Sequence, residues 1–533
     1  MTTSVIERPE AATAAQAANS RGAMLALARV EARRLLRHPV TIAGLLLFLG
    51  PMVYQWVSGG ANRFPVLHDE DWSKQFIGLL TLGGAALVAA NLAALRAHRH
   101  GTAAQYGVLV LPHAWRTGAF LLAVVPFAGI VALLVVVRIG LLALLPSAAG
   151  RPNPAELAVY PAVVLLLGAL GVLLARVLRT AVLAPLVLLG IVVFTFIGVL
   201  GSVPGSRYLA WLMPVSVEEP LMPYPIDMME RPAGRHLAYL AGLIVVLVAA
   251  ALAVTGARGR RLTLAGAAGL AVAVLAGSAQ YLPVSDAVKK ASLDAVERPA
   301  GMQTCRTIDQ VTYCAFDDFA PWIDGWDTVV RGVLRGVPEQ EARKPLAVRQ
   351  RVSTDDNRSN GFVSGPEDRA KVAEVWKRVD DAAGTPNAVT VGTRWGEGED
   401  EAGFAGRVAF EVVARKGPGV DGVICGTRGV LVGWLAGQAT PLAAEGLREI
   451  DASSTGGVWF FDRSFNTFIS VSDREMAVAK ALLKRPAAEV AETVKRSWAE
   501  LSAAGTPTER AGELFGVPVP PQEPEGERSV CME

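Results

Sequence analysis

Charged residues are scarce in this chain of 533 amino acids. They make up 19% of the sequence against 52% hydrophobic residues, and the mean hydropathy is +0.36. Such a balance excludes an ordinary soluble protein, which must cover its core with polar surface. The formal net charge of +2 also argues against a strongly basic nucleic-acid-binding protein, so no nucleic-acid partner is expected.

Several chemical groups and motifs are missing. All six histidines precede position 237, and none of the four cysteines belongs to a C-x-x-C pair. The second half therefore lacks Ser-His-Asp or Cys-His catalysis, and the cysteines do not fit a structural zinc site. H-E-x-x-H and G-x-x-x-x-G-K-[ST] are absent from the whole chain, which argues against a zinc peptidase and against a bound ATP. We predict no enzyme activity, no catalytic residue, no cofactor and no metal.

Acidic and aromatic residues in the second half could bind a ligand, but we favour surface positions for the acids and core positions for the aromatic residues. Acidic residues cluster at 317–318, 355–356, 380–381 and 397–401. A glycosidase-like pair or a calcium site would need such groups, yet acidic loop residues are usually solvated surface. The aromatic side chains are interpreted as core rather than as a ligand platform: Trp322, Trp326, Trp395, Trp434, Trp459, Phe460 and Phe461.

Long apolar runs fill the first half. Seven of them are near the roughly 20 residues that a helix needs to cross a bilayer: 41–58, 76–95, 118–146, 157–175, 181–202, 237–255 and 262–282. Inside a bilayer the backbone must satisfy its own hydrogen bonds, so such runs are predicted to be helices. The last run is rich in Ala and Gly, and the prediction is therefore six to seven transmembrane helices.

Charge divides the chain into two parts with different surroundings. Cut at Val284, the first part carries a net charge of about +10 and the second about −8. We predict a cytoplasmic N-terminus at 1–40, a transmembrane permease domain at 41–283, an extracytoplasmic domain at 284–516 and a disordered tail at 517–533. With the N-terminus inside, fourteen basic residues flank the inner ends of the spans and six the outer ends. Seven spans then place the acidic half outside a plasma membrane.

A basic amphipathic helix precedes the first span. Leu25, Ala28, Ala32 and Leu35 form an apolar stripe, and the basic residues repeat every four positions beside it: Arg29, Arg33 and Arg37. Such a helix suits the headgroup layer, where its arginines would pair with anionic lipids. It could equally be a charged flank that only fixes topology.

The acidic half combines helical and strand patterns, which predicts an α+β domain. Helices are expected at 286–297, 318–336, 366–383, 427–437, 442–450, 473–484, 487–503 and 508–515, and strands at 346–353, 387–394, 404–415 and 458–471. Cys305 and Cys314 enclose eight residues, a length suited to a hairpin closed by a disulfide in an oxidising exterior. Two reduced buried cysteines in a cytosolic domain are the alternative. Cys425 and Cys531 have no assigned partner.

Several stretches resemble permease subunits of actinobacterial ABC exporters. They are "LARVEARRLLRHPV" before the first span, "RHGTAAQY" and "LPHAWRTG" in the largest inner loop, and the passages "LAWLMP" and "RHLAYLAGL". The acidic half is similar to an extracytoplasmic extension of some of these permeases through "CRTIDQVTYC", "CGTRGVLVGWLAGQATP" and "SWAELSAAGTPTERAGELFGVP". The usual family permease has six spans with both ends inside, so a seventh span would be a departure.

The resemblance implies ATP-driven export in which a separate cytoplasmic ABC ATPase subunit hydrolyses ATP. The permease would form the translocation path as a homodimer or heterodimer among membrane lipids. Arg29, Arg33 and Arg37 would anchor an elbow helix, and the ATPase-docking loop would be framed by Arg96, Arg99, His100 and Arg116. The alternative is a non-transporting membrane sensor or cell-envelope interaction protein whose external domain binds a ligand.

Overall fold

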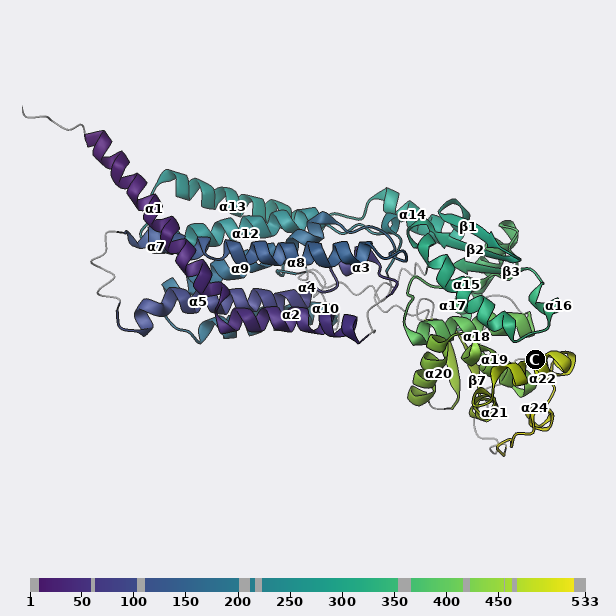
Figure 1. The fold of residues 1–533 in the computed structure, drawn as a ribbon. Coiled ribbons are helices and arrows are strands. Elements are labelled where there is room, and N and C mark those ends of the chain that lie inside the picture. The colour runs from purple at the N-terminus through teal and green to yellow at the C-terminus, as the bar shows by residue number, and fades with distance from the viewer. Residues whose placement is uncertain are drawn as a thin grey trace, which may run out of the picture.

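The computed structural model contains an elongated helix bundle followed by a mixed helix and strand domain (Figure 1). It describes residues 9–58, 63–102, 111–200, 211–215, 223–352, 366–415, 422–454, 456–462 and 467–521. Helix α13 of the bundle ends at Ala279 and the first helix of the next region begins at Asp286, on either side of the predicted boundary.

The bundle is built from the apolar runs of the first half. Its elements are α2 (Pro39–Val57), α3 (Leu67–Glu70), α4 (Gln75–Gly78), the π-helical η1 (Leu79–Gly83), α5 (Gly84–Arg99), α7 (His113–Leu122), α8 (Val125–Ala143), α9 (Pro154–Val177), α10 (Leu183–Leu200), α12 (Ala233–Val254) and α13 (Arg260–Ala279). In the described part of the chain, six helices are long and apolar enough to cross a membrane, and Leu183–Ile197 is a shorter apolar stretch. The run at 262–282 is one of the six. This is a multi-pass membrane protein with the expected six to seven apolar helices.

Local sequence fixes where several of these helices begin. Before α2, the His38 side chain accepts a hydrogen bond from the Val40 backbone N–H (3.3 Å), and Pro39 occupies the first helical position. Asn153 and Pro154 start α9 in the same way. Proline suits this position because its missing N–H would have no partner within the helix.

The run at 118–146 belongs to one apolar span, His113–Ala143, that contains a break. Helix α7 ends at Leu122 and α8 begins at Val125, with Pro126 in its first turn. A proline inside a continuous helix would remove a backbone hydrogen bond. In the first turn of a helix the backbone N–H groups have no partner within the helix, so a proline there loses no such bond. Further along α8, Arg138 pairs with Glu70 of α3 instead of standing alone among apolar side chains.

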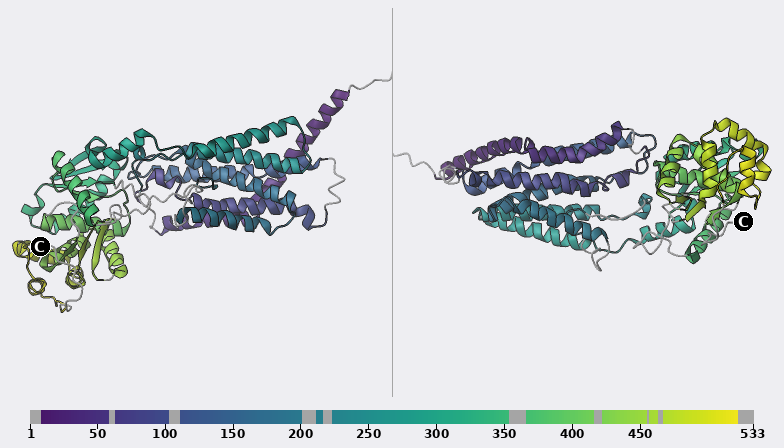
Figure 2. Two further views of the ribbon diagram at one scale, coloured as in Figure 1. Left: turned by 180° about the vertical axis from the view of Figure 1, so that it is seen from behind. Right: turned by 90° about the horizontal axis from the view of Figure 1, so that it is seen from below.

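The N-terminal helix and the C-terminal domain lie at opposite ends of the bundle (Figures 1 and 2). Helix α1 (Pro9–Leu36) crosses one end obliquely, and its first turns project beyond the other helices. We call this the basic end, because it carries the predicted arginine-rich connections, and the other the domain end. With the shorter apolar stretch Leu183–Ile197 added to the six long ones, the described residues contain seven apolar segments.

The C-terminal domain contains two small sheets with helices around them. Its helical elements are α14 (Asp286–Glu297), η3 (Pro299–Gly301), η4 (Asp317–Trp322), α15 (Ile323–Arg335), α16 (Glu339–Ala342), α17 (Pro366–Ala382), α18 (Gly398–Ala414), α19 (Gly426–Gln438), α20 (Pro441–Ser453), α21 (Asp473–Leu483), α22 (Ala487–Arg496), α23 (Trp498–Leu501) and α24 (Thr508–Phe515). The 3-10 segment η2 (Ile226–Met228) precedes α12 in the chain.

The first sheet has the order β1-β2-β3-β4 and the second the order β5-β7-β6. The strands are β1 (Gln303–Ile308), β2 (Val311–Phe316), β3 (Leu346–Gln350), β4 (Val389–Val391), β5 (Gly422–Ile424), β6 (Val458–Asp462) and β7 (Thr467–Val471). Strand β1 is antiparallel to β2, whereas β2, β3 and β4 are parallel, because α15 and α17 provide the crossovers. One continuous apolar core joins the two sheets.

Most predicted elements of the domain are present, but the strand predicted at 404–415 is wrong. These residues belong to α18, which packs against α15, α19, α20 and β6. Its buried positions include 404, 405, 408, 409 and 412, which is helical spacing. A helix covered on nearly every side is apolar all round, and its β-branched and aromatic residues then resemble those of a strand.

The region predicted to be a disordered tail is folded at its beginning. Val517 is buried, Val519 packs against the domain core, and Arg474 Nε donates to the Pro520 carbonyl (3.0 Å). The remainder of the tail, including Cys531, lies outside the described residues.

Candidate functional site at the basic end of the helix bundle

Helix α1 lies against the bundle rather than standing apart from it. Ala28, Ala32 and Leu35 of the predicted apolar stripe are buried, whereas Leu25 is 48% exposed. A Cβ added at Gly118 of α7 would lie 3.3 Å from the Met24 sulfur, so the two helices are in direct contact. The stripe is thus used mainly for packing on protein.

Glu31 joins α1 to α5. Its side chain is only 5% exposed, and both carboxylate oxygens accept from Arg96 Nη1 at 2.9 Å. Arg34 Nη1 donates to the same carboxylate at 2.8 Å. Charge-assisted bonds of this kind are strong in a partly buried setting, and removal of one partner leaves the other charge uncompensated.

The sequence interpretation overlooked Glu31, although a signal was present. Four arginines surround this single acidic residue within nine positions: Arg29, Arg33, Arg34 and Arg37. A lone acid within a basic helix that also carries an apolar stripe indicates an internal ion pair more than a solvated residue.

The three arginines predicted to anchor an elbow helix are exposed. Arg29 and Arg33 lie on the uncovered side of α1, and Arg37 follows its last turn. They are free of the buried stripe and accessible to lipid or to another chain, as the elbow hypothesis requires. Their role stays a prediction.

The four residues predicted to frame a docking loop do not form one cluster. Arg96 is bound to Glu31, Arg99 and His100 are exposed at the end of α5, and Arg116 is buried in the first turns of α7. Arg116 Nε donates to the Leu111 carbonyl at 2.9 Å. Residues 103–110 of the predicted docking loop lie outside the described part of the chain.

Arg176, at the end of α9, adds to the positive charge of this end. Its guanidinium lies 5.3 Å from the centre of the Phe120 ring on α7. A cation over an aromatic face is attracted by the ring quadrupole, which helps to hold a charge at the edge of an apolar bundle. The basic end is therefore a surface of arginines fixed by a few interhelical contacts.

In the C-terminal domain, the predicted disulfide between Cys305 and Cys314 is present. The two residues are directly paired across the β1–β2 hairpin, with Cys314 buried and Cys305 exposed. Cys425 is disulfide-bonded as well.

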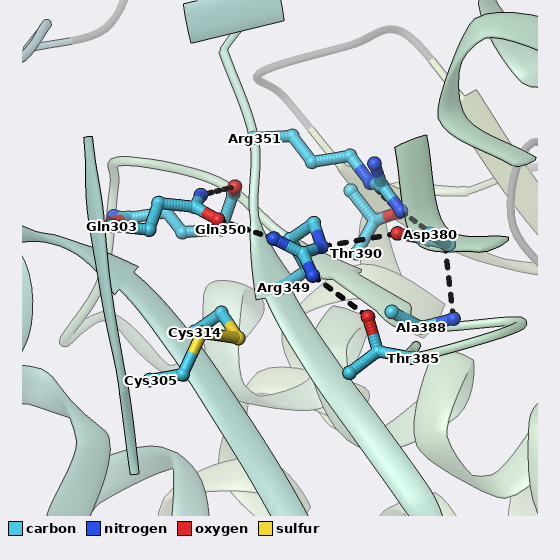
Figure 3. A network of polar contacts seen from close by, with 10 residues as sticks. All are labelled: Gln303, Cys305, Cys314, Arg349, Gln350, Arg351, Asp380, Thr385, Ala388 and Thr390. Carbon is cyan, nitrogen blue, oxygen red and sulfur yellow. Dashed lines mark hydrogen bonds and ion pairs between the residues drawn. A yellow bond between two sulfur atoms is a disulfide. The ribbon is translucent and has the colours of Figure 1, made fainter. Parts of the chain in front are cut away.

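Beside the disulfide lies a buried network of two arginines and one aspartate (Figure 3). Arg349 Nε lies 3.1 Å from Asp380 Oδ1 and Arg351 Nη2 lies 2.7 Å from Asp380 Oδ2. Arg349 also donates to Gln303 and Thr385, at 2.6 and 2.7 Å. Burial lowers the pKa of Arg351 to about 10, although Asp380 acts in the opposite direction. These contacts fix α17 on β3.

The acidic pairs of the second half have different surroundings in the described residues. Asp380 binds arginines while Asp381 is exposed, and Asp317 accepts a hydrogen bond from Thr304 Oγ1 at 2.7 Å. Glu399, Asp400 and Glu401 occupy the first turn of α18, where acidic groups favour the helix dipole. Within the ranges that the structure covers, no group of three or more His, Cys, Asp or Glu side chains could hold a metal ion. Residues 355–356 fall outside those ranges.

Most of the aromatic group is core. Trp322, Trp326, Trp434 and Phe460 are buried completely or nearly so, as is Trp395. Trp459 is 40% exposed and stacks on Phe468 at 4.5 Å between ring centres.

Comparisons with protein-family models, curated proteins and solved structures found no match to this chain.

Proposed function

We propose that this chain is the permease subunit of an ATP-driven exporter, coupled to a separate cytoplasmic ATP-binding subunit. Support comes from the sequence resemblance, from the six long apolar helices, and from the absence of a phosphate-binding motif that would let the chain bind ATP itself. The basic end would face the cytoplasm, in accordance with the positive-inside rule.

The contact between Glu31 and Arg96 carries this proposal. It joins helix α1 to the last turns of α5, directly before the segment expected to dock on an ATPase. A force applied to either element would reach the other through a partly buried pair of charges. The exposed Arg99 and His100 would contact the acidic surface of the partner.

The test is purification of the full chain from its native membranes, followed by measurement of associated ATPase activity. Introduction of negative charge at Arg99 and His100 (R99E, H100D) should reduce the retained ATPase activity at least about tenfold, because charges at the rim of an interface govern association. Arg496→Glu, an exposed change on α22 of the C-terminal domain, is the matched control. Failure to recover any ATPase with the unmodified chain would refute the permease proposal.

A second candidate function is favoured by the way in which the C-terminal domain is attached. Loops of the bundle contribute Val66, Ala149 and Met228 to the core of that domain. A ligand bound by the domain could therefore act on the helices without any transport. This sensor would purify without an ATPase, and R99E and H100D would not change its behaviour.

A further inference from the structure

Two loops at the domain end of the bundle are joined to each other. Val66, before α3, pairs with Ala149, before α9, in an isolated parallel β-bridge. The Leu67 N–H donates to the Ala149 carbonyl (2.9 Å), and the Ala149 N–H donates to the Pro65 carbonyl (2.8 Å). The loop after α2 and the loop after α8 thus form one unit.

The 3-10 segment η4 of the C-terminal domain binds this unit. The Gly150 N–H donates to the Asp318 carbonyl at 3.0 Å, and Trp322 Nε1 donates to the Ser147 carbonyl at 2.9 Å. The Asp318 side chain also accepts from the Ile226 N–H, at 2.8 Å, in the segment that precedes α12. A single segment of six residues therefore holds three loops of the bundle.

Phe64 inserts into an aromatic socket beside η4. Its ring lies edge-on to Trp322 and Trp395, with centres 6.4 and 6.2 Å away. At Gly325 a Cβ would come within 2.9 Å of the Phe64 ring and 3.0 Å of Trp395 Nε1, so glycine leaves the room that the ring occupies. The partial burial of this aromatic ring helps to hold the loop after α2 on the domain.

The first and third loops are also tied together directly. His68 Nε2 lies 2.7 Å from the Tyr224 carbonyl, and Arg231 Nη1 donates to the His68 carbonyl at 3.0 Å. The Arg231 guanidinium lies 4.0 Å from the centre of the Trp72 ring. Each loop is therefore held both by η4 or its socket and by another loop, and none can leave without loss of contacts in the others.

We propose that η4 is a clasp that closes the domain end of the bundle and makes the three loops open together. The loops connect to α2, α8, α9 and α12, so these helices can separate at that end only when the clasp releases or moves with them. Release of the loops by η4 and opening of the bundle at this end are then one cooperative event. The proposal is independent of the permease function, because it concerns contacts that any cargo or signal would have to break.

Hydrogen–deuterium exchange of the full chain in lipid nanodiscs tests the clasp. Trp322→Phe keeps an aromatic ring but removes the N–H donated to Ser147, and Phe64→Ala empties the socket. The matched control is Trp326→Phe, in the same core, because the Trp326 indole N–H has no hydrogen-bond partner among the residues that the structure describes. Peptides covering 63–68, 147–151 and 224–229 report the three loops.

Both clasp variants should speed exchange about tenfold in all three peptides together, as expected for loss of a hydrogen bond or anchor in a cooperative unit. The control should leave all three within about twofold of the unmodified chain. Faster exchange at 147–151 alone in W322F would show that the loops open independently and would overturn the proposal, as would equal effects of W322F and W326F. If F64A does not fold, F64L provides the same comparison with a smaller change.

Discussion

Asp380, a buried carboxylate of the C-terminal domain, is shared by two buried arginines. Asp380 serves both Arg349 and Arg351 and also accepts from the Ala388 N–H at 3.2 Å. Arg351 lies 4.8 Å from the centre of the Trp376 ring, so its charge is further stabilised. From the sequence, Asp380 is only one of two adjacent acidic residues, because its partners Arg351 and Arg349 lie 29 and 31 residues away in the chain.

Removal of the Asp380 charge should be costly. Asp380→Asn leaves two buried guanidinium groups without a counter-charge, and we expect a loss of about 3–5 kcal/mol in the stability of the domain. Thermal unfolding followed by tryptophan fluorescence measures it. Asp381→Asn, at the exposed neighbour, should change little, and similar melting temperatures for the two variants would contradict the assignment.

Glu401 should make stability depend on pH. Burial raises the pKa of Glu401, although the Thr440 hydroxyl and Arg63 act in the opposite direction. Because its pKa is raised, the folded state binds the Glu401 proton more tightly than the unfolded state does. The bound proton therefore stabilises the fold fully below the ordinary pKa near 4.5, and this stabilisation is lost as pH rises through the pKa of the folded state. Glu401→Gln should therefore raise the melting temperature at pH 7 and not at pH 4. Glu445→Gln, exposed on the facing helix α20, should do so at neither pH.

The packing of helices in the bundle depends on how closely their backbones approach as much as on hydrophobic side chains. Helices α5 and α9 meet where Gly171 faces Leu87, and Asn91 Nδ2 donates to the Gly171 carbonyl at 3.1 Å. Small residues at helix crossings in membranes let backbones approach and pack without a hydrophobic driving force. The apolar runs were readable from sequence, but this crossing was not, because any of several glycines could have been the contact.

Gly171→Ala should therefore destabilise the bundle. A Cβ at this position would lie 2.3 Å from the Leu87 carbonyl oxygen, which is backbone and cannot rotate away. We expect a loss of about 1–3 kcal/mol, as for other overpacked sites, measured as a lower melting temperature of the purified full chain. Gly129→Ala on α8 should be neutral, because a Cβ there would lie more than 4 Å from every other described residue outside its own helix turn.

At the scale of the whole molecule, the basic end and the C-terminal domain are separated by the length of the bundle (Figure 2). If the proposed orientation holds, Cys305 faces the exterior and Arg99 the cytoplasm. After mild reduction of intact cells, a membrane-impermeant maleimide should label Cys305, which is exposed, and the signal should fall in a C305S/C314S variant, which keeps Cys425 and Cys531. A cysteine placed at Arg99 should react only after permeabilisation. The opposite pattern would reverse the topology.

Sequence by itself determined the apolar helices, the asymmetry of charge and the disulfide hairpin, because each depends on residues close together in the chain: run length, flanking arginines and an eight-residue spacing. It also placed α14 and α24 at their observed bounds. Tertiary structure alone decided that 404–415 is a helix, that Glu31 binds Arg96, and that η4 holds three loops of the bundle. These features arise from partners far apart in the chain, 65 residues for Glu31 and Arg96 and 175 for Ser147 and Trp322, and no local pattern specifies which distant group will arrive.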